Sequence, residues 1–241
     1  MGVRYDGATQ MWHRRGDRLI LDEVPDVYGN VPIEKGDVIL DLGAHIGTTS
    51  RLFLSKGARH SIAVEADPVN VMLLRRNLHG LSATILPAAV GAKAGRMPFY
   101  TRADRGFVGS IIPDEGRKRV IVPVVAFADL LDTYRPSVVK ADIEFSEYGL
   151  PELRALPDFV RIVAMEVHIR YVGIFTGRVI DADELLERRS AAADLIAAID
   201  AQGFVQTWRK DKQARPDQIA ADDELPLGAM TKCACITWVR G

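Results

Sequence analysis

Cysteine is scarce in this 241-residue sequence, which contains only Cys233 and Cys235. The two alternate within an apolar run that predicts a β-strand, and residues two apart on one strand are poorly placed for a disulfide. No cysteine or histidine close to them in the sequence completes a zinc-binding pattern. We therefore expect two reduced, structural thiols, as is usual for a cytoplasmic protein.

Long hydrophobic runs and a strong net charge are also missing. No apolar stretch approaches the ~20 residues that a membrane-spanning helix needs, and the first residues have no apolar core of the kind found in signal peptides. The 31 Lys and Arg nearly balance the 32 Asp and Glu, so the formal net charge is −1. This balance gives no electrostatic reason to expect a nucleic acid or an anionic membrane as a partner. We expect a cytoplasmic protein, whose oligomeric state the sequence leaves open.

What the sequence does contain is a regular alternation of apolar runs and amphipathic segments. Strands are predicted at residues 38–42, 62–65, 83–90, 97–101, 119–125, 138–143, 161–167, 203–208 and 233–239, and helices at 48–56, 67–80, 127–134, 147–156 and 181–202. Such alternation predicts a parallel sheet covered by helices on both faces. The last two strands have no helix between them, so we expect an antiparallel closing pair. Residues 1–35 look like an N-terminal extension that packs on a single α/β domain, residues 36–241.

The first predicted strand runs into a glycine turn. Asp41, Gly43 and Gly47 form the pattern D-x-G-x-x-x-G, whereas dinucleotide-binding folds use G-x-G-x-x-G. Glycines let the backbone pass close to a ligand and adopt positive φ. Glu65 closes the following apolar run, where a carboxylate can accept hydrogen bonds from both ribose hydroxyls. The pattern is typical of the S-adenosylmethionine (SAM) loop of class I methyltransferases, so we expect SAM as the cofactor.

The expected cofactor contacts lie at the strand ends. The loop and Asp41 would hold the methionine part of SAM, Glu65 the ribose, and the end of the third strand near Ala88 the adenine. The full predicted set is Asp41, Gly43, Ala44, His45, Gly47, Thr48, Glu65, Ala66, Ala88 and Asp142. His45 stands where the general loop has a glycine, so we expect positive φ there. Its ring would touch the rim of the cofactor, with a catalytic role as the alternative.

Two further strands end in ionisable residues. Period-two alternation places Lys140, Asp142 and Glu144 on one face of the strand at 138–143, and Glu166 and His168 on one face of the strand at 161–167. Ligands of open α/β sheets bind beyond these carboxyl ends, so these five are the candidate catalytic residues. His168 or Asp142 would be the base, and a Lys140–Glu166 pair is the structural alternative. Asp, Glu and His could also hold Mg²⁺, but no ligand spacing requires a metal, and we predict none.

Together these motifs resemble the FkbM-type family of SAM-dependent methyltransferases. The resemblance is carried by residues 36–47, where the family usually has Asn at the position of His45, and by Glu65-Ala66-Asp67-Pro68, Arg76-Asn77-Leu78, Ala88-Ala89-Val90-Gly91, Val122-Pro123-Val124 and Phe127-Ala128-Asp129-Leu130-Leu131. Its most specific part is residues 139–147, which are similar to the family's K-x-D-[VI]-E-G-x-E, followed by Glu166-Val167-His168. The match covers about residues 25–170.

The resemblance implies both a fold and an activity. The fold would be the class I methyltransferase (Rossmann-like) fold, a doubly wound, mostly parallel seven-stranded sheet with an antiparallel closing pair. The activity would be O-methylation of a hydroxyl on a small-molecule acceptor, such as a sugar or a secondary metabolite. Residues 1–35, 101–118 and 209–231 would help to build the acceptor pocket.

Phe145 departs from the family pattern, which has glycine at this position. A bulky ring beside the site should narrow or reshape the acceptor pocket. If the ring closes the pocket, the chain would be a non-catalytic accessory module that binds SAM or a nucleoside. An NAD-linked oxidoreductase on the same scaffold is the other alternative, disfavoured by the missing second glycine of G-x-G-x-x-G.

Overall fold

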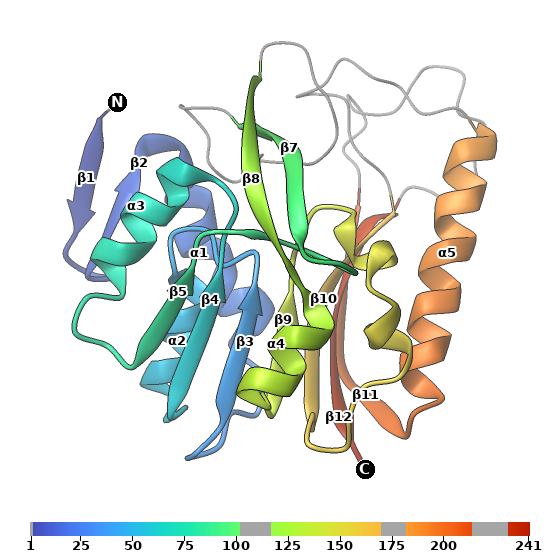
Figure 1. The fold of residues 1–241 in the computed structure, drawn as a ribbon. Coiled ribbons are helices and arrows are strands. Elements are labelled where there is room, and N and C mark those ends of the chain that lie inside the picture. The colour runs from blue at the N-terminus through green and yellow to red at the C-terminus, as the bar shows by residue number, and fades with distance from the viewer. Residues whose placement is uncertain (1, 102–116, 170–181, 214–230) are drawn as a thin grey trace.

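The computed structural model describes residues 2–101, 117–169, 182–213 and 231–241, and its centre is a seven-stranded sheet (Figure 1). The strand order is β11-β12-β10-β9-β3-β4-β5. The strands are β3 (Val38–Leu42), β4 (His60–Val64), β5 (Ala83–Leu86), β9 (Val138–Ala141), β10 (Ile162–His168), β11 (Phe204–Gln213) and β12 (Thr231–Arg240). Neighbours pair in parallel except β12, which is antiparallel to both β10 and β11. The predicted mostly parallel sheet with an antiparallel closing pair is confirmed.

Helices cover both faces of this sheet (Figure 1). One face carries α1 (Arg18–Tyr28), α2 (Thr48–Ser55) and α3 (Pro68–Asn77), and the other carries α4 (Phe127–Tyr134) and α5 (Ala182–Asp200). Ile39 of β3 packs with α1 and α2, whereas Leu40 and Leu42 join the core under α4 and α5. Alternate strand residues point to opposite faces, so a strand covered on both sides is largely apolar on both faces.

The N-terminal residues take part in this packing. They form β1 (Val3–Asp6), β2 (Met11–Arg14), a 3₁₀ turn at Arg15–Asp17, and α1. The first two strands pair as an antiparallel hairpin. Met11 and Leu21 pack with Ile46 of the glycine loop and Leu73 of α3. The extension therefore touches the same loop that the sequence identifies as the cofactor loop.

Two predicted elements differ from the structure. The strand expected at 83–90 ends at Leu86, and Ala89–Gly91 instead forms β6 in a second, three-stranded sheet with β7 (Gly95–Thr101) and β8 (Lys118–Ala126). The helix expected at 147–156 is two short 3₁₀ turns, Ser146–Gly149 and Pro151–Arg154. Pro151 has no N–H to donate, and its ring disfavours helical backbone at the preceding residue.

Other local predictions agree more closely. Asp67 caps α3 through its side chain with Pro68 at the first helical position, as expected. On α5, Leu185, Leu195 and Ile199 are buried, but Leu186, predicted on the same face, is 56% exposed. The predicted functional loops at 101–118 and 209–231 fall largely outside the described residues.

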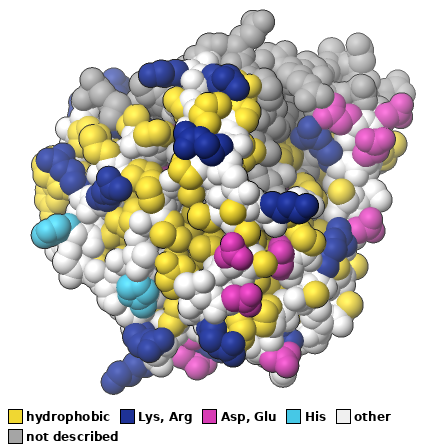
Figure 2. Space-filling model, viewed as in Figure 1, with side chains coloured by type: hydrophobic (Ala, Val, Ile, Leu, Met, Phe, Trp, Pro, Cys, Tyr) yellow, Lys and Arg dark blue, Asp and Glu magenta, His cyan; other side chains and the backbone are white. Residues whose placement is uncertain are grey.

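None of the described helices has both the length and the apolar character needed to cross a membrane. Figure 2 shows hydrophobic side chains lying between separate Lys, Arg, Asp and Glu side chains on the face viewed in Figure 1.

Asp37, at the start of β3, joins the beginnings of neighbouring strands. Its buried carboxylate accepts hydrogen bonds from Ser137 Oγ (2.7 Å), Arg161 Nε (3.1 Å) and the Glu34 backbone N (2.7 Å). Burial alone would raise the pKa of Asp37, but Arg161 and the other donors outweigh it and hold the pKa below its ordinary value of 3.8.

We predict that Asp37→Asn lowers the free energy of unfolding at neutral pH by about 1–3 kcal/mol, because it removes the charge that partners Arg161. Because the pKa of Asp37 is lower in the folded state than in the unfolded state, its charge stabilises the protein at pH values above 3.8. This stabilisation is lost as the pH falls through the pKa of the folded state. Urea denaturation near neutrality and at about pH 3 should therefore show the difference between wild type and variant shrinking in acid. The exposed Asp132→Asn is the control, and an equal difference at both pH values would contradict the prediction.

Candidate active site

The loop after β3 requires glycine at two positions. Gly43, His45 and Gly47 have φ angles of 74°, 52° and 93°, so the positive φ predicted for His45 is confirmed. A Cβ on Gly43 would lie 1.9 Å from the backbone O of Asp142, and a Cβ on Gly47 would lie 2.8 Å from Leu74 Cδ1. The loop can therefore pass against the end of β9 and against α3 only because it has no side chain at these points.

Asp41 and Lys140 form a buried ion pair beneath this loop. Lys140 Nζ lies 3.1 Å from Asp41 Oδ1 and donates to the backbone O of Leu42 (3.2 Å) and of Gly43 (2.8 Å). The second oxygen of Asp41 accepts from Ser50 Oγ at 2.7 Å. Burial alone would lower the pKa of Lys140, but Asp41 and Asp142 raise it above its ordinary value of 10.5.

This pair changes two interpretations made from the sequence. Lys140 is paired with Asp41, so the Lys140–Glu166 pair considered as an alternative is not the one that forms. Asp41 is fully buried, and its contacts with Lys140 and Ser50 are internal to the protein. Both residues support the glycine loop from below.

Glu65 is held in place by three N–H donors at the end of β4. Its carboxylate accepts from the backbone N of His45 (2.8 Å), the backbone N of Asp67 (2.7 Å) and Asn70 Nδ2 (3.3 Å). Glu65 is only 7% exposed, so it is not simply a charged residue in solvent at the end of a strand. Burial of the carboxyl raises its pKa, although the hydrogen bond from Asp67 and the charge of His45 oppose the shift.

The N-terminal segment reaches the glycine loop through Asp17. This buried carboxylate accepts from the backbone N and from Nε of Arg14, both at 2.8 Å, and lies 3.5 Å from His45 Nε2. Arg14 also donates to Asn70, which in turn donates to Glu65. Burial alone would raise the pKa of Asp17, but His45 and Arg14 hold it well below its ordinary value. A continuous set of contacts therefore links residues 14–17 to both the loop and the ribose-binding candidate.

Asn77, at the end of α3, makes a second connection between the same parts. Its side chain accepts from the backbone N of Trp12 (2.7 Å) and donates to the backbone O of Trp12 (2.9 Å) and of Ile46 (2.8 Å). The guanidinium of Arg76 stacks on the Trp12 ring at 4.4 Å. One amide thus joins β2, α3 and the glycine loop.

His168, at the end of β10, is oriented by Glu147. Glu147 Oε1 accepts from the backbone N of His168 at 2.8 Å and lies 3.1 Å from its Nδ1. Burial alone would lower the pKa of His168, but Glu147, Glu144 and Glu166 outweigh it and raise the pKa well above 6.5. The Nδ1 contact turns the opposite nitrogen, Nε2, toward the end of β9.

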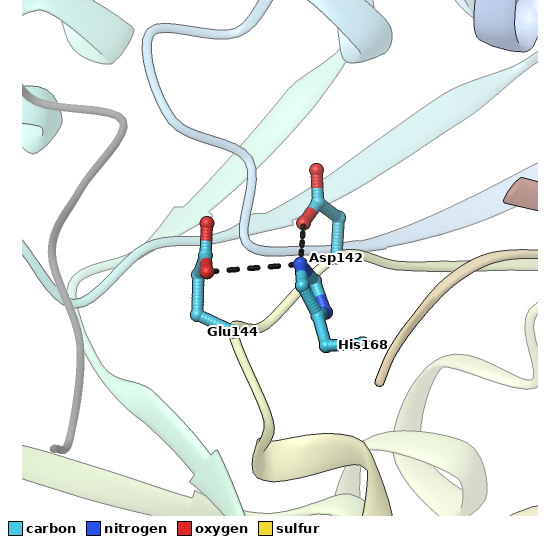
Figure 3. Close-up of side chains that lie close together, drawn as sticks. All are labelled: Asp142, Glu144 and His168. Carbon is cyan, nitrogen blue, oxygen red and sulfur yellow. Dashed lines mark ion pairs between the residues drawn. The ribbon is translucent and has the colours of Figure 1, made fainter. Parts of the chain in front are cut away.

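Asp142 and Glu144 meet His168 at this point, as Figure 3 shows. Nε2 of His168 lies 3.9 Å from Asp142 Oδ1 and 3.6 Å from Glu144 Oε2. The ligand-type atoms of the three residues all lie within 4.8 Å of one another, an arrangement that could hold a cation. The predicted convergence of Asp142, Glu144 and His168 is therefore present, although Lys140 lies apart from it beneath the loop.

Glu166 occupies the buried side of the same group. Its Oε1 lies 3.6 Å from His168 Nε2, and the Cys233 and Cys235 thiols donate to its two oxygens at 2.8 and 3.6 Å. Both cysteines are buried, and neither is in a disulfide.

Phe145 stands beside the group in a backbone conformation that favours glycine. Glu144 and Phe145 have φ angles of 49° and 74°, and the Phe145 ring centroid lies 5.2 Å from that of His168. The guanidinium of Arg188 lies 4.7 Å from the Phe145 ring. The ring therefore lies beside the group formed by Asp142, Glu144 and His168, where the sequence predicted a narrowed pocket.

Ala44, Thr48, Ala66 and Ala88 complete the set of predicted cofactor contacts. Among the predicted cofactor contacts, Ala44 and Ala88 are buried, Ala66 packs against the second sheet, and Thr48 begins α2. Sequence reasoning gave no role to Arg14, Asp17, Asn70, Asn77 or Glu147. Glu147 and Asn77 had a sequence signal, since Glu147 is the last residue of the K-x-D-[VI]-E-G-x-E match and Asn77 lies in the Arg76-Asn77-Leu78 motif.

Comparison with known proteins was made by family and by structure. The model for the methyltransferase FkbM domain matches residues 41–204. A search of curated proteins found no match. Methyltransferase FkbM from Methylobacillus flagellatus KT aligns with a TM-score of 0.51 and 16% identity, over 87% of this chain and 45% of that chain. A putative S-adenosylmethionine dependent methyltransferase from Listeria monocytogenes aligns with a TM-score of 0.50 and 11% identity, over 91% of this chain and 98% of that chain.

These structural likenesses concern the fold. At such identities they agree with a class I methyltransferase fold and carry no acceptor from one protein to another. This chain spans less than half the length of the Methylobacillus protein.

We predict that Asn77→Ala loosens both segments that its amide joins. Loss of three hydrogen bonds should lower the free energy of unfolding by about 2–3 kcal/mol. Amide hydrogen exchange should accelerate at residues 11–14 and also at residues 43–47, because the loop loses its anchor. Gln206→Ala, which removes an exposed amide bonded to Asp200, is the control. Unchanged exchange in the loop would mean that Asn77 does not support it.

Proposed function

This chain belongs to the FkbM methyltransferase family, and on that premise we propose that it transfers the methyl group of SAM to a hydroxyl group of a small molecule. SAM is the cofactor, and it supplies a sulfonium methyl group that is a strong electrophile. The observation that carries the proposal is the convergence at one sheet edge of the glycine loop, Glu65 and Asp142. Family membership also removes the basis for an NAD-linked oxidoreductase.

The residues on the cofactor side fit SAM. Glu65 is fixed by N–H donors, yet its carboxylate oxygens have further lone pairs for the ribose hydroxyls. Gly43 and Gly47 present backbone without side chains, and Thr48 Oγ1 is a buried hydroxyl with no hydrogen-bond partner. Such an unsatisfied polar group calls for a partner. The loop would hold the methionine part, with Ala66 and Ala88 beside the adenine.

The acceptor would bind on the other side of the loop, where Asp142, Glu144, Glu166 and His168 meet. The side chains of Asp142 and Glu144 are 32% and 33% exposed, whereas that of His168 is 5% exposed and tied to Glu147. We therefore assign proton removal to Asp142 rather than His168. As the hydroxyl oxygen bonds to the methyl carbon, the C–S bond breaks with its electron pair on sulfur, and the hydroxyl proton passes to Asp142.

Most of the required rate enhancement would come from positioning, because the methyl donor is already activated. Lys140 acts at a distance by holding the loop, and Glu166 and His168 shape the acceptor side. The non-catalytic alternative depends on Phe145, which stacks beside His168 and could close the pocket. The two experiments below test cofactor binding and pocket access separately.

We predict that SAM and S-adenosylhomocysteine stabilise the protein and that NAD does not. Ligand at about 100 times its Kd adds about 2.7 kcal/mol, or roughly 5–10 °C in Tm for a domain of this size. Glu65→Gln should weaken the shift, because a neutral amide is a poorer acceptor for two ribose hydroxyls. Glu187→Gln, on an exposed position of α5, is the control. Absence of a shift with both SAM compounds would contradict the proposed function.

We predict that Phe145→Gly changes the acceptor range while leaving the SAM-induced thermal shift in place. Glycine adopts the observed φ of 74° readily, so the backbone should stay as it is. A panel of hydroxylated acceptors, with S-adenosylhomocysteine release as the readout, separates two cases. If Phe145 tunes the site, both proteins turn over acceptors with different preferences. If it closes the site, only the variant does, and the non-catalytic alternative holds for the natural chain.

A further inference from the structure

His168 has one nitrogen held by hydrogen bonding and the other turned toward carboxylates. Nδ1 lies 3.1 Å from Oε1 of the fully buried Glu147, which fixes the ring orientation and places the N–H on that side. Nε2 lies 3.6–3.9 Å from the nearest oxygens of Asp142, Glu144 and Glu166. Each of these distances is too long for a hydrogen bond. The imidazole side chain is only 5% exposed, and its Nε2 faces three carboxylates without making a hydrogen bond to any of them.

The spacing of these atoms suits ligands that share a cation. Ligands about 2.0–2.2 Å from one ion lie roughly 2.8–3.1 Å apart when they are adjacent and roughly 4.0–4.4 Å apart when they are opposite in octahedral geometry. The His168–Asp142 and His168–Glu144 distances, 3.9 and 3.6 Å, lie between these two separations, so side-chain shifts of roughly 0.5–1 Å would bring the ligand atoms around one ion. All three ligand atoms lie within 4.8 Å, and Figure 3 shows both carboxylates turned toward the same nitrogen.

The surroundings of the histidine support the same interpretation. A histidine that binds a metal almost always donates its other N–H to a carboxylate or a carbonyl, and this second contact fixes the tautomer. Glu147 provides that contact to His168. Asp142 and Glu144 are each about one third exposed, so coordination positions would remain open to water or to an acceptor.

We propose that Asp142, Glu144 and His168 form a binding site for a divalent cation of the Mg²⁺ or Mn²⁺ class. The proposal rests on the proposed function, because the cation would sit where the acceptor hydroxyl is expected. A hydroxyl bound to such an ion loses its proton more readily. This answers a difficulty in the mechanism, since a carboxylate such as Asp142 is a weak base for an ordinary alcohol.

The direct test is Mn²⁺ binding to the full chain after removal of metals with EDTA. Electron paramagnetic resonance of free Mn²⁺ and calorimetry should show one ion per chain, displaced by excess Mg²⁺. Asp142→Asn and His168→Gln should weaken binding at least 10-fold. Glu147→Gln, which leaves all three ligands in place, should weaken it about 10–100-fold. Asp158→Asn, at a fully exposed position, is the control and should bind as the wild type does.

Several outcomes would overturn the proposal. Equal affinity in the wild type and the ligand variants would place the ion elsewhere, and no binding at about 1 mM Mn²⁺, with or without SAM, would exclude the site. If a variant fails to fold, displacement of bound Mn²⁺ by Mg²⁺ in the wild type still tests whether the chain binds a cation of this class. The SAM thermal shift of the EDTA-treated protein tests the proposed function separately. Methyl transfer by the EDTA-treated protein without added metal would support the proposed function and contradict the proposed cation site.

Discussion

A single buried ammonium group holds the two central strands of the site together. Lys140 comes from β9, and its partners, Asp41 and the backbone oxygens of Leu42 and Gly43, come from β3 and the loop that follows. Lys140 and Leu42 are 98 residues apart in the sequence. A buried charge without a partner costs several kcal/mol, so each member of the pair depends on the other. The sheet positions both the cofactor loop and Asp142 through this contact.

Local sequence patterns predicted the parts of the fold that local physics determines. The apolar runs, the Asp67-Pro68 helix start and the positive φ of His45 each depend on residues close in the sequence, and each is found. The helix expected at 147–156 is divided into two 3₁₀ turns, because Pro151 disfavours helical backbone at the residue before it. Asp17 was not predicted for a different reason: only tertiary structure brings it to His45, and an acidic residue in a polar segment has no distinctive pattern. Alternation along two strands that end at the same sheet edge predicted the meeting of Asp142, Glu144 and His168, but not Glu147 as the residue that orients the ring.

The protein fixes the orientation of one important side chain on each side of the site. On one side Glu65 is held by backbone N–H groups and Asn70, and on the other His168 is held by Glu147. In both cases a side chain suited to binding a ligand has its orientation fixed by hydrogen bonds within the protein. Fixed orientation reduces the entropy lost on binding and the reorganisation needed during reaction. The acceptor side differs in having Phe145 at its edge, where the backbone itself would accept glycine.

The interior position of β12 has a consequence for the order of folding. β12 lies between β10 and β11, so β10 has an unpaired edge until the last strand in the sequence has been synthesised. Pairings between distant segments form slowly, and unpaired strand edges favour association with other chains. The strand left open in this way is the one that ends in Glu166 and His168. In a nascent chain this edge of β10 therefore stays unpaired until β12 is available to cover it.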